Sequence, residues 1–522
     1  MSVNILKRYR LPILPPQVTE FMVPAVFTDR AEATRENEVL GEFLALQHDF
    51  AAQQRILFWI CRLTRKEFVR VSKKHQTSLR RGVARTAQLP YRKSVTFQIL
   101  GGTEMRYKLL TAAFAATAAL QFAGPAAATD LEVIHWWTSK GESAAVSQFA
   151  KAFDNDGKGD KWVDSAIALG ETARSTVMQR VLGGDPPGAA QFNPGRQYEE
   201  LISGGKLLDL TDVATAGKWD QIIRPKAIGS ACLVDGHWWC VPVNIHSNYW
   251  AWYSKPVFEK AGVPEPKNMA DFIAAAPKIK EAGFIPFAIG GDGNGWQIQL
   301  LFQDMVTEAL GVAKRDEMYT KKSAEIAGSP EMKGVFTQLR ALKQFTDNGY
   351  ANRNWNDTTN LVITGKAGLQ VMGDWARGEF AAAGMTGVKD FGCMIGLNEA
   401  KPVVSTDGDI IVFFKQNNPD VEAAQKRLAA LLISPEVQVA FNNAKGSMPV
   451  RADVDMSTAD PCMQKSLKAV EDPANIVTAT NRFITENTNQ QINELVAQYF
   501  ADDSMTADDA TAKFATVIGN SD

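Results

Sequence analysis

Residues 131–142 read Leu-Glu-Val-Ile-His-Trp-Trp-Thr-Ser-Lys-Gly-Glu, and this stretch decides how the rest of the chain is interpreted. It begins as an apolar, β-prone run, passes through Trp136 and Trp137, and ends on Glu142. From 143 to 153, apolar side chains then recur with a helical period. The order predicts a core strand, a turn and a helix. In open α/β sheets, ligands bind at the carboxyl ends of such strands.

The segments that follow alternate between strand and helix patterns. We predict strands over Trp162–Leu169 and Ala189–Phe192, with an amphipathic helix over Glu171–Leu182 between them. This spacing is typical of βαβ units and of a largely parallel sheet. The aromatic run Tyr249–Tyr253 and the apolar run Ile410–Phe414 predict further buried strands. The fold class is therefore α/β.

Three polar or glycine-rich stretches are interpreted as loops. The glycines of 290–295 lack the Lys-Ser/Thr pair of a phosphate loop, so this segment is predicted to be a turn that presents Trp296. Asp407-Gly408-Asp409 is interpreted as a turn with solvated acids. Asn443 to Ser447 is interpreted as a loop between helices.

Length and charge narrow the class of protein. The 522 residues allow two or three domains, and 45% hydrophobic with 22% charged residues is ordinary for a soluble globular chain. The net charge is -2, but residues 1–104 are rich in Arg and Lys, so the remainder is acidic. An acidic body argues against nucleic acid as a partner, because phosphate contacts require clustered cations.

Residues 105–128 have the anatomy of a secretory signal peptide. A short basic start at Met105 precedes the apolar run Leu109–Ala123, and small residues end at Ala128, which predicts a mature protein beginning at Thr129. An internal signal implies that translation starts near Met105, so residues 1–104 are a doubtful leader rather than part of the natural product. Two alternatives stay open: a buried Ala-rich helix, and a real basic N-terminal domain.

The cysteines are compatible with export. Cys61 lies in the doubtful leader, whereas Cys232 and Cys240 flank a hairpin turn at Asp235-Gly236. A disulfide and two buried thiols are both open for this pair, and the same question stands for Cys393 and Cys462. None of these four forms a C-x-x-C pair, so the sequence predicts no metal or redox site and no cofactor.

An ordered series of motifs carries a family likeness. The motifs are Trp136-Trp137 with Gly141-Glu142, the run Leu182 to Pro187 with Gln191, Val241 to His246, Met372 to Trp375, and Lys445 to Ser447. Together they resemble the extracellular solute-binding proteins of ABC sugar importers, and most closely the bacterial glucose/mannose-binding branch. The likeness covers residues 130–522 and none of 1–104.

The resemblance implies two α/β lobes that are joined by a hinge of two or three crossover strands and are discontinuous in sequence. The sugar binds in the cleft between the lobes, which close over it. The expected boundaries are 129–245 for the first part of lobe 1, 246–384 for lobe 2, 385–425 for a return to lobe 1, and 426–522 for C-terminal helices that belong mainly to lobe 2.

The resemblance also implies a set of ligand-binding residues. Aromatic faces cover the apolar C–H faces of a pyranose, and charged or amide side chains bind its hydroxyl groups. Adjacent strand residues point to opposite faces, so only one of the two neighbouring tryptophans is expected to touch the sugar unless the strand has already ended. The implied residues are Trp136, Trp137, Glu142, Gln191, Asn193, His246, Trp296, Asp374 and Lys445.

The expected function is capture of a glucose-like monosaccharide in the periplasm and its delivery to the membrane permease of an ABC importer. The protein is expected to be a monomer without catalytic residues, hence not an enzyme. Three alternatives stay open. An exported carbohydrate-active enzyme would also use tryptophans and a pair of carboxylates. An importer protein could bind another solute, such as a glycerol phosphate or a peptide, although a phosphate ligand would need an arginine cluster and arginine is sparse in these motifs. A cytoplasmic protein with a basic interaction domain is the third alternative.

Overall fold

The computed structural model describes residues 129–521. The predicted leader and the predicted signal peptide at 105–128 lie outside the described residues. Between residues 129 and 521, no helix combines the length and apolar character needed to span a bilayer.

The first lobe is built on a five-stranded mixed sheet with the order β2-β1-β3-β12-β6. Strands β1, β2 and β3 run parallel, whereas β12 is antiparallel to both of its neighbours, β3 and β6. The apolar runs at 131–134 and 410–413 are buried in this sheet, which explains the sequence pattern. The strands are β1 (Asp130–His135), β2 (Lys161–Ala166), β3 (Ala189–Phe192), β6 (Cys240–Pro242) and β12 (Ile410–Phe413).

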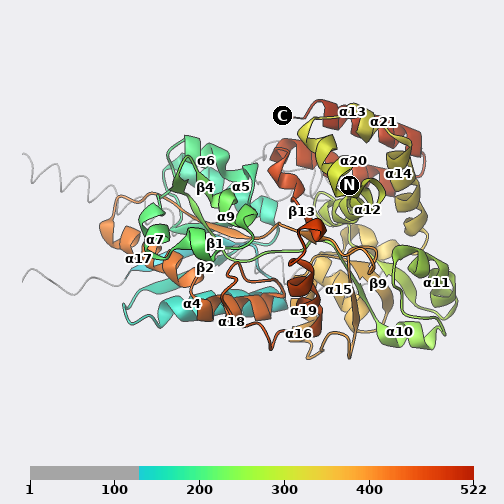
Figure 1. The fold of residues 1–522 in the computed structure, drawn as a ribbon, viewed down its shortest axis with the longest axis horizontal. Coiled ribbons are helices and arrows are strands. Elements are labelled where there is room, and N and C mark those ends of the chain that lie inside the picture. Colours follow the sequence, from blue (N-terminus) through green and yellow to red (C-terminus); the bar gives the residue numbers. More distant parts are fainter. Residues whose placement is uncertain (1–128, 522) are drawn as a thin grey trace, which may run out of the picture. The chain divides into compact units, whose positions relative to one another are not determined.

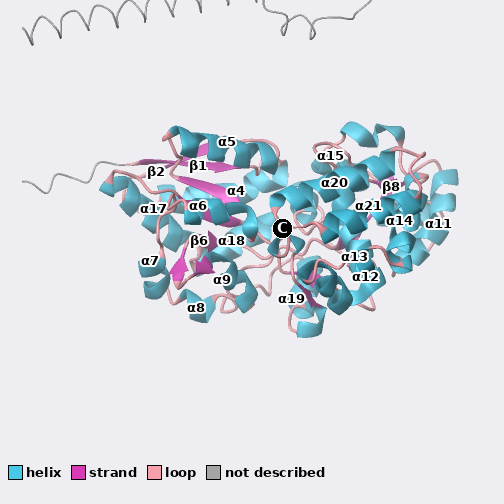
Figure 2. Cartoon of the chain, turned by 90° about the horizontal axis from the view of Figure 1, so that it is seen from above, coloured by secondary structure: helices cyan, strands magenta, loops and turns pink. Residues whose placement is uncertain are grey.

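Helices pack against this sheet. The first is α4 (Lys140–Asp154), which Ser139 and Glu142 begin with a reciprocal capping box that satisfies two free backbone N–H groups. Figure 2 shows β1, β2 and β6 among the helices of this lobe. The others are α5 (Gly170–Gly183), α6 (Glu199–Ser203), α7 (Thr211–Ala216), α8 (Trp219–Ile222), α9 (Lys226–Cys232), α17 (Pro419–Leu432) and α18 (Pro435–Lys445).

The second lobe is built on a four-stranded sheet with the order β10-β7-β9-β8. Its strands are β7 (Trp250–Tyr253), β8 (Ile285–Ala288), β9 (Ala367–Val371) and β10 (Gly392–Ile395). Its helices are α10 (Lys255–Lys260), α11 (Met269–Glu281), α12 (Trp296–Thr320), α13 (Ala324–Ala327), α14 (Pro330–Lys343), α15 (Trp355–Ile363), α16 (Ala376–Ala382), α19 (Pro461–Ala469), α20 (Glu486–Ala501) and α21 (Ala507–Gly519). The two sheets with their helices confirm the predicted α/β class.

Two expected lobe boundaries differ from the structure. The return to the first lobe does not begin at residue 385, because β10 still pairs with β7 of the second sheet. The C-terminal helices do not belong mainly to the second lobe from residue 426 onward, because α17 and α18 pack on α4 of the first lobe. Figure 1 shows both of these late helices beside α4. Their apolar faces match the first lobe, which sequence order alone does not reveal.

Within residues 129–521, the chain crosses three times between the lobes: from β6 to β7, from β10 to β12, and from α18 to α19. Along these crossings, β11 (Val404–Ser405) pairs in parallel with β13 (Ile476–Val477). Single β-bridges join Ile245 to Met448 and His246 to Asp407. The crossover segments are therefore hydrogen-bonded to one another, and they bring residues from three distant parts of the sequence to one place between the sheets.

Both open cysteine pairs are disulfides. Cys232 bonds to Cys240 across the short hairpin of β4 (Leu233–Val234) and β5 (His237–Trp238). Its turn residues Asp235 and Gly236 both have positive φ, as a two-residue hairpin turn requires. Cys393 in β10 bonds to Cys462 in α19 and fixes that helix to the second sheet.

Candidate functional site

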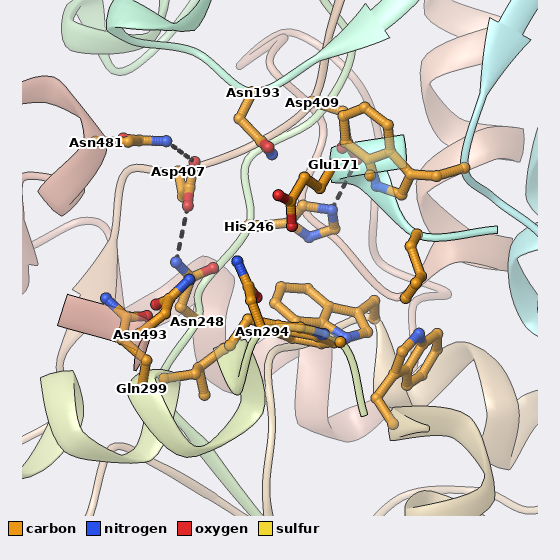
Figure 3. Close-up of a pocket in the computed structure, with 18 of the residues that line it drawn as sticks. Glu171, Asn193, His246, Asn248, Asn294, Gln299, Asp407, Asp409, Asn481 and Asn493 are labelled. Carbon is orange, nitrogen blue, oxygen red and sulfur yellow. Dashed lines mark hydrogen bonds and ion pairs between the residues drawn. The ribbon is translucent and has the colours of Figure 1, made fainter. Parts of the chain in front are cut away.

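A cavity of about 550 Å³ lies where residues of both lobes meet. This volume is within the range of roughly 300–1,000 Å³ that is typical of small-molecule sites. Its lining combines tryptophans with carboxylates, many side-chain amides and three cationic side chains. Figure 3 shows several of these polar side chains pointing toward a common space. We call this cavity the cleft.

Trp136 lies on the first-lobe side of the cleft, directly after β1. Its backbone N–H donates a 3.0 Å hydrogen bond to Gln191 Oε1, and the guanidinium of Arg174 lies 5.5 Å above its ring. The neighbouring Trp137 also borders the cleft, but it is only 1% exposed and packs against Phe149 and Phe441. Trp136 therefore offers a ring to the cleft, and Trp137 belongs chiefly to the core.

A buried ion pair lies in the lining of the cleft. Lys445 Nζ is 3.0 Å from Glu142 Oε1, and both side chains are buried. Glu142 lies in the first turn of α4 and Lys445 in the last turn of α18. The interpretation of 443–447 as a loop is therefore wrong for its first half, because the helix continues to Lys445 and ends at Gly446, which has a φ of 96°.

His246 lies on the first crossover segment, between two carboxylates. Its Nδ1 donates to Asp374, which follows β9, and its Nε2 donates at 2.9 Å to Asp409, which precedes β12. Burial would lower the pKa of His246, but the charges of Asp374 and Asp409 outweigh burial and raise it to about 9. Burial would likewise raise the pKa of Asp409, but His246 and Lys445 bring it down to about 2. The imidazolium therefore ties a residue of each lobe to the crossover.

Three tryptophans come from the second lobe. Trp296 and Trp355 are the first residues of α12 and α15, and Trp375 directly precedes α16. The rings of Trp296 and Trp375 are 6.3 Å apart, and all three tryptophans are partly exposed in the cleft lining. Short turns at helix N-termini thus present aromatic rings to the cleft.

A second part of the lining is rich in side-chain amides. Asp407 accepts hydrogen bonds from Asn248 at 2.8 Å and from Asn481 at 3.2 Å, as Figure 3 shows. Burial raises the pKa of the Asp407 carboxyl. Gln299 and Asn493 point to the same side of the cleft from α12 and α20. Amides both donate and accept, so this wall can bind a ligand rich in hydroxyl groups.

The cleft brings together seven of the nine residues that the sequence predicted for the site. Gln191 and Asp374 are not in its lining. Gln191 donates a 2.7 Å hydrogen bond to Asp409, and Asp374 binds His246, so both hold lining residues from behind. Direct contact of these two side chains with a ligand stays a prediction. The seven lining residues are Trp136, Trp137, Glu142, Asn193, His246, Trp296 and Lys445.

Sequence reasoning missed several lining residues. The interpretation of Asp407 and Asp409 as solvated acids is wrong, because the crossover segment at 244–248 covers this turn and buries Asp409. On α20, Glu486, Asn489 and Asn493 recur at helical spacing and all line the cleft. That polar stripe on an otherwise amphipathic helix was a readable signal. Trp355 and Arg174 stood alone in their segments and gave none.

Residues 137–439 match the family model described as bacterial extracellular solute-binding protein. The chain belongs to this family. The resemblance predicted from its motifs is therefore confirmed, and members of such a family are binding proteins rather than enzymes. In the part of the chain described by the structure, no cluster of His, Cys, Asp or Glu could hold a metal ion.

Curated relatives and solved structures agree with this membership. This solute-binding protein is 38% identical over 357 residues to a "Probable sugar-binding periplasmic protein" of Rhizobium meliloti (strain 1021), a match that covers 68% of this chain and 84% of the relative. A solved chitin oligosaccharide binding protein has a TM-score of 0.65 at 18% identity and covers 75% of this chain and 98% of its own. The bacterial solute receptor AcbH, described as having an exclusive substrate preference for b-D-galactopyranose, has a TM-score of 0.63 at 17% identity, and the match covers 74% of this chain and 97% of AcbH. The structural likenesses support the two-lobed fold.

Proposed function

We propose that the protein is the periplasmic sugar-binding component of an ABC importer and that its ligand is a glucose-like monosaccharide. The observation that carries the proposal is the composition of the cleft, in which tryptophan rings from both lobes face a wall of amides and carboxylates. Aromatic rings match the C–H faces of a pyranose. Side-chain amides and carboxylates match its hydroxyl groups, each of which both donates and accepts.

The charges of the cleft support a neutral ligand. Among the lining residues described, each of the three cationic side chains already contacts a carboxylate: Arg174 with Glu486, Lys445 with Glu142, and His246 with Asp409. A sugar phosphate or a uronate would need a cation without a partner to offset its charge. The alternative ligand class of glycerol phosphates is therefore disfavoured.

Delivery of the sugar to the permease follows from the two-lobed fold. Binding would favour a closed state of the two lobes that the ligand stabilises further, and that state would dock on the membrane permease. The name of the Rhizobium meliloti relative supports a periplasmic sugar as the ligand class. Secretion through residues 105–128 and a monomeric state are part of the proposal.

Thermal unfolding of the mature chain in a panel of monosaccharides tests the function. A ligand that binds only the folded state raises both the free energy of unfolding and the unfolding temperature. The free energy of unfolding rises by about 2.7 kcal/mol when the ligand concentration is a hundred times Kd. We expect glucose or a close epimer to raise it and glucose 6-phosphate to leave it unchanged. The proposal fails if no sugar raises the unfolding temperature, or if only the phosphorylated sugar does.

A further inference from the structure

We infer that Glu486, held by Arg174 and Gln197 across the two lobes, forms an end stop that limits the length of the sugar the cleft accepts. This inference rests on the proposed function and adds a ligand class to it: a short sugar, without further rings extending past Glu486.

The end stop is built from both lobes. Glu486 is the first residue of α20 in the second lobe, and its two carboxylate oxygens are bound separately by first-lobe side chains. Arg174 of α5 donates to Oε1 at 3.0 Å, and Gln197 donates to Oε2 at 2.7 Å. A second contact runs in parallel, from Gln490 of α20 to Glu171 of α5 at 3.1 Å. Both carboxylate oxygens are therefore engaged across the lobes.

The same three side chains border the cleft. Arg174, Gln197 and Glu486 are all lining residues, and the side chains of Arg174 and Glu486 retain 16% and 30% exposure, whereas Glu142 and Lys445 are buried. The end stop is thus more exposed than the ion pair of Glu142 and Lys445. A sugar ring that extended in this direction would have to displace the Glu486 carboxylate from both of its partners.

The backbone beside the end stop is closely packed. At Gly195, which precedes Gln197, an added Cβ would come within 2.5 Å of the Asn481 carbonyl oxygen, so the first-lobe loop lies directly against the segment that leads into α20. Arg174 is also restrained, because its guanidinium lies over the Trp136 ring as well as on Glu486. The barrier is therefore held by backbone packing and by two side-chain contacts at once.

Glu486→Ala removes the central group of the end stop. The test measures, by calorimetry on the mature chain, the affinities for glucose and for its α-1,4- and β-1,4-linked di- and trisaccharides. We expect wild type to bind glucose and no trisaccharide. In E486A, the ratio of trisaccharide to glucose affinity should rise at least tenfold, and in Gln197→Ala, which removes one of the two contacts, by a smaller factor.

Glu317→Ala is the matched control, since Glu317 is an exposed glutamate of α12 whose ion pair with Lys321 lies within one helix. It should leave the ratio unchanged, and circular dichroism of each variant without ligand checks its folding. If wild type binds trisaccharides as well as it binds glucose, the end stop is overturned but the proposed function is not. The same holds if neither E486A nor Q197A gains trisaccharide binding. A wild type that binds none of these sugars overturns the proposed function as well.

Discussion

The ammonium group of Lys445 lies 3.0 Å from the carboxylate of Glu142, although the two residues are 303 positions apart in the chain. Glu142 occupies the N-terminal turn of α4 and Lys445 the C-terminal turn of α18. Each charge is therefore at the helix end where the macrodipole favours it. The pair fixes the packing of these two helices and, with it, part of the cleft lining.

Removal of one member of this pair should be costly. Glu142→Gln or Lys445→Met leaves an uncompensated buried charge, and we expect each to lower the free energy of unfolding by about 3–5 kcal/mol. The double variant E142Q/K445M should lose less than the sum of the two. Urea unfolding followed by circular dichroism measures all three.

The exposed pair of Lys321 and Glu317 provides the comparison, because Lys321→Met should lower the free energy of unfolding far less than Lys445→Met does. Equal, small losses at Lys445 and Lys321 would show that the buried pair is not a structural contact of the kind described.

Substitutions of the two adjacent tryptophans should have different effects, one on sugar affinity and the other on stability. Trp136 is partly exposed in the cleft, so Trp136→Ala should weaken sugar affinity at least tenfold with little loss of stability. Trp137 is buried against Phe149 and Phe441, so Trp137→Ala should cost about 3–5 kcal/mol of unfolding free energy. Calorimetry with the sugar and urea unfolding of the same preparations measure both. The opposite division of effects would reverse the two assignments.

His246 should make stability fall in mildly alkaline solution. Its pKa is raised from 6.5 to about 9 in the folded protein, after the charges of Asp374 and Asp409 outweigh burial. A raised folded pKa contributes stability that is fully present below the unfolded pKa and is lost as the pH rises through the folded pKa. We expect a loss of about 3 kcal/mol between pH 6.5 and 9.5 from this group.

The slope of unfolding free energy against pH is the readout. The unfolding free energy of His246→Gln should be lower than that of wild type at pH 6.5 but should change little with pH across this window. An unchanged slope in H246Q would contradict the charged bridge between the lobes.

The disulfide that closes the longer loop should contribute more to the free energy of unfolding than the one that closes the shorter loop. Cys393 and Cys462 are 69 residues apart and Cys232 and Cys240 only 8, so the first closes the larger loop in the unfolded chain. By the loop-closure argument, Cys393→Ser/Cys462→Ser should lower stability by roughly 4 kcal/mol and Cys232→Ser/Cys240→Ser by roughly 2–3 kcal/mol. Urea unfolding of the two double variants under oxidising conditions tests this order.

The sequence predicted the buried strands well because a strand that is buried on both faces consists of consecutive apolar or aromatic residues. Ile410–Phe413 and Trp250–Tyr253 are buried on both faces and read as continuous apolar or aromatic runs. Lobe membership was harder to predict. The sequences of α17 and α18 show an apolar face but do not show which lobe that face packs against. Shape complementarity depends on both surfaces and cannot be predicted from one helix alone.

Site residues could be predicted where they belong to recognisable motifs. They could not be predicted where contacts with distant segments determine whether a side chain is buried. Asp409 is flanked by a glycine in a turn, which locally favours solvent exposure, yet His246, Asn244 and Gln191 all converge on it from other segments. Conversely, the position of Asp374 at a strand end suggested ligand contact, but His246 and the Ser247 N–H occupy its two oxygens.

The disulfides join each cysteine of the described chain to the next one along the sequence, Cys232 with Cys240 and then Cys393 with Cys462. A chain that enters an oxidising compartment from its N-terminus exposes its cysteines in this same order. Among these four cysteines, each bond can therefore form as soon as its second thiol emerges, before the next thiol of the set is present. Oxidation in the order of emergence yields the native pairing of these four cysteines without disulfide exchange among them.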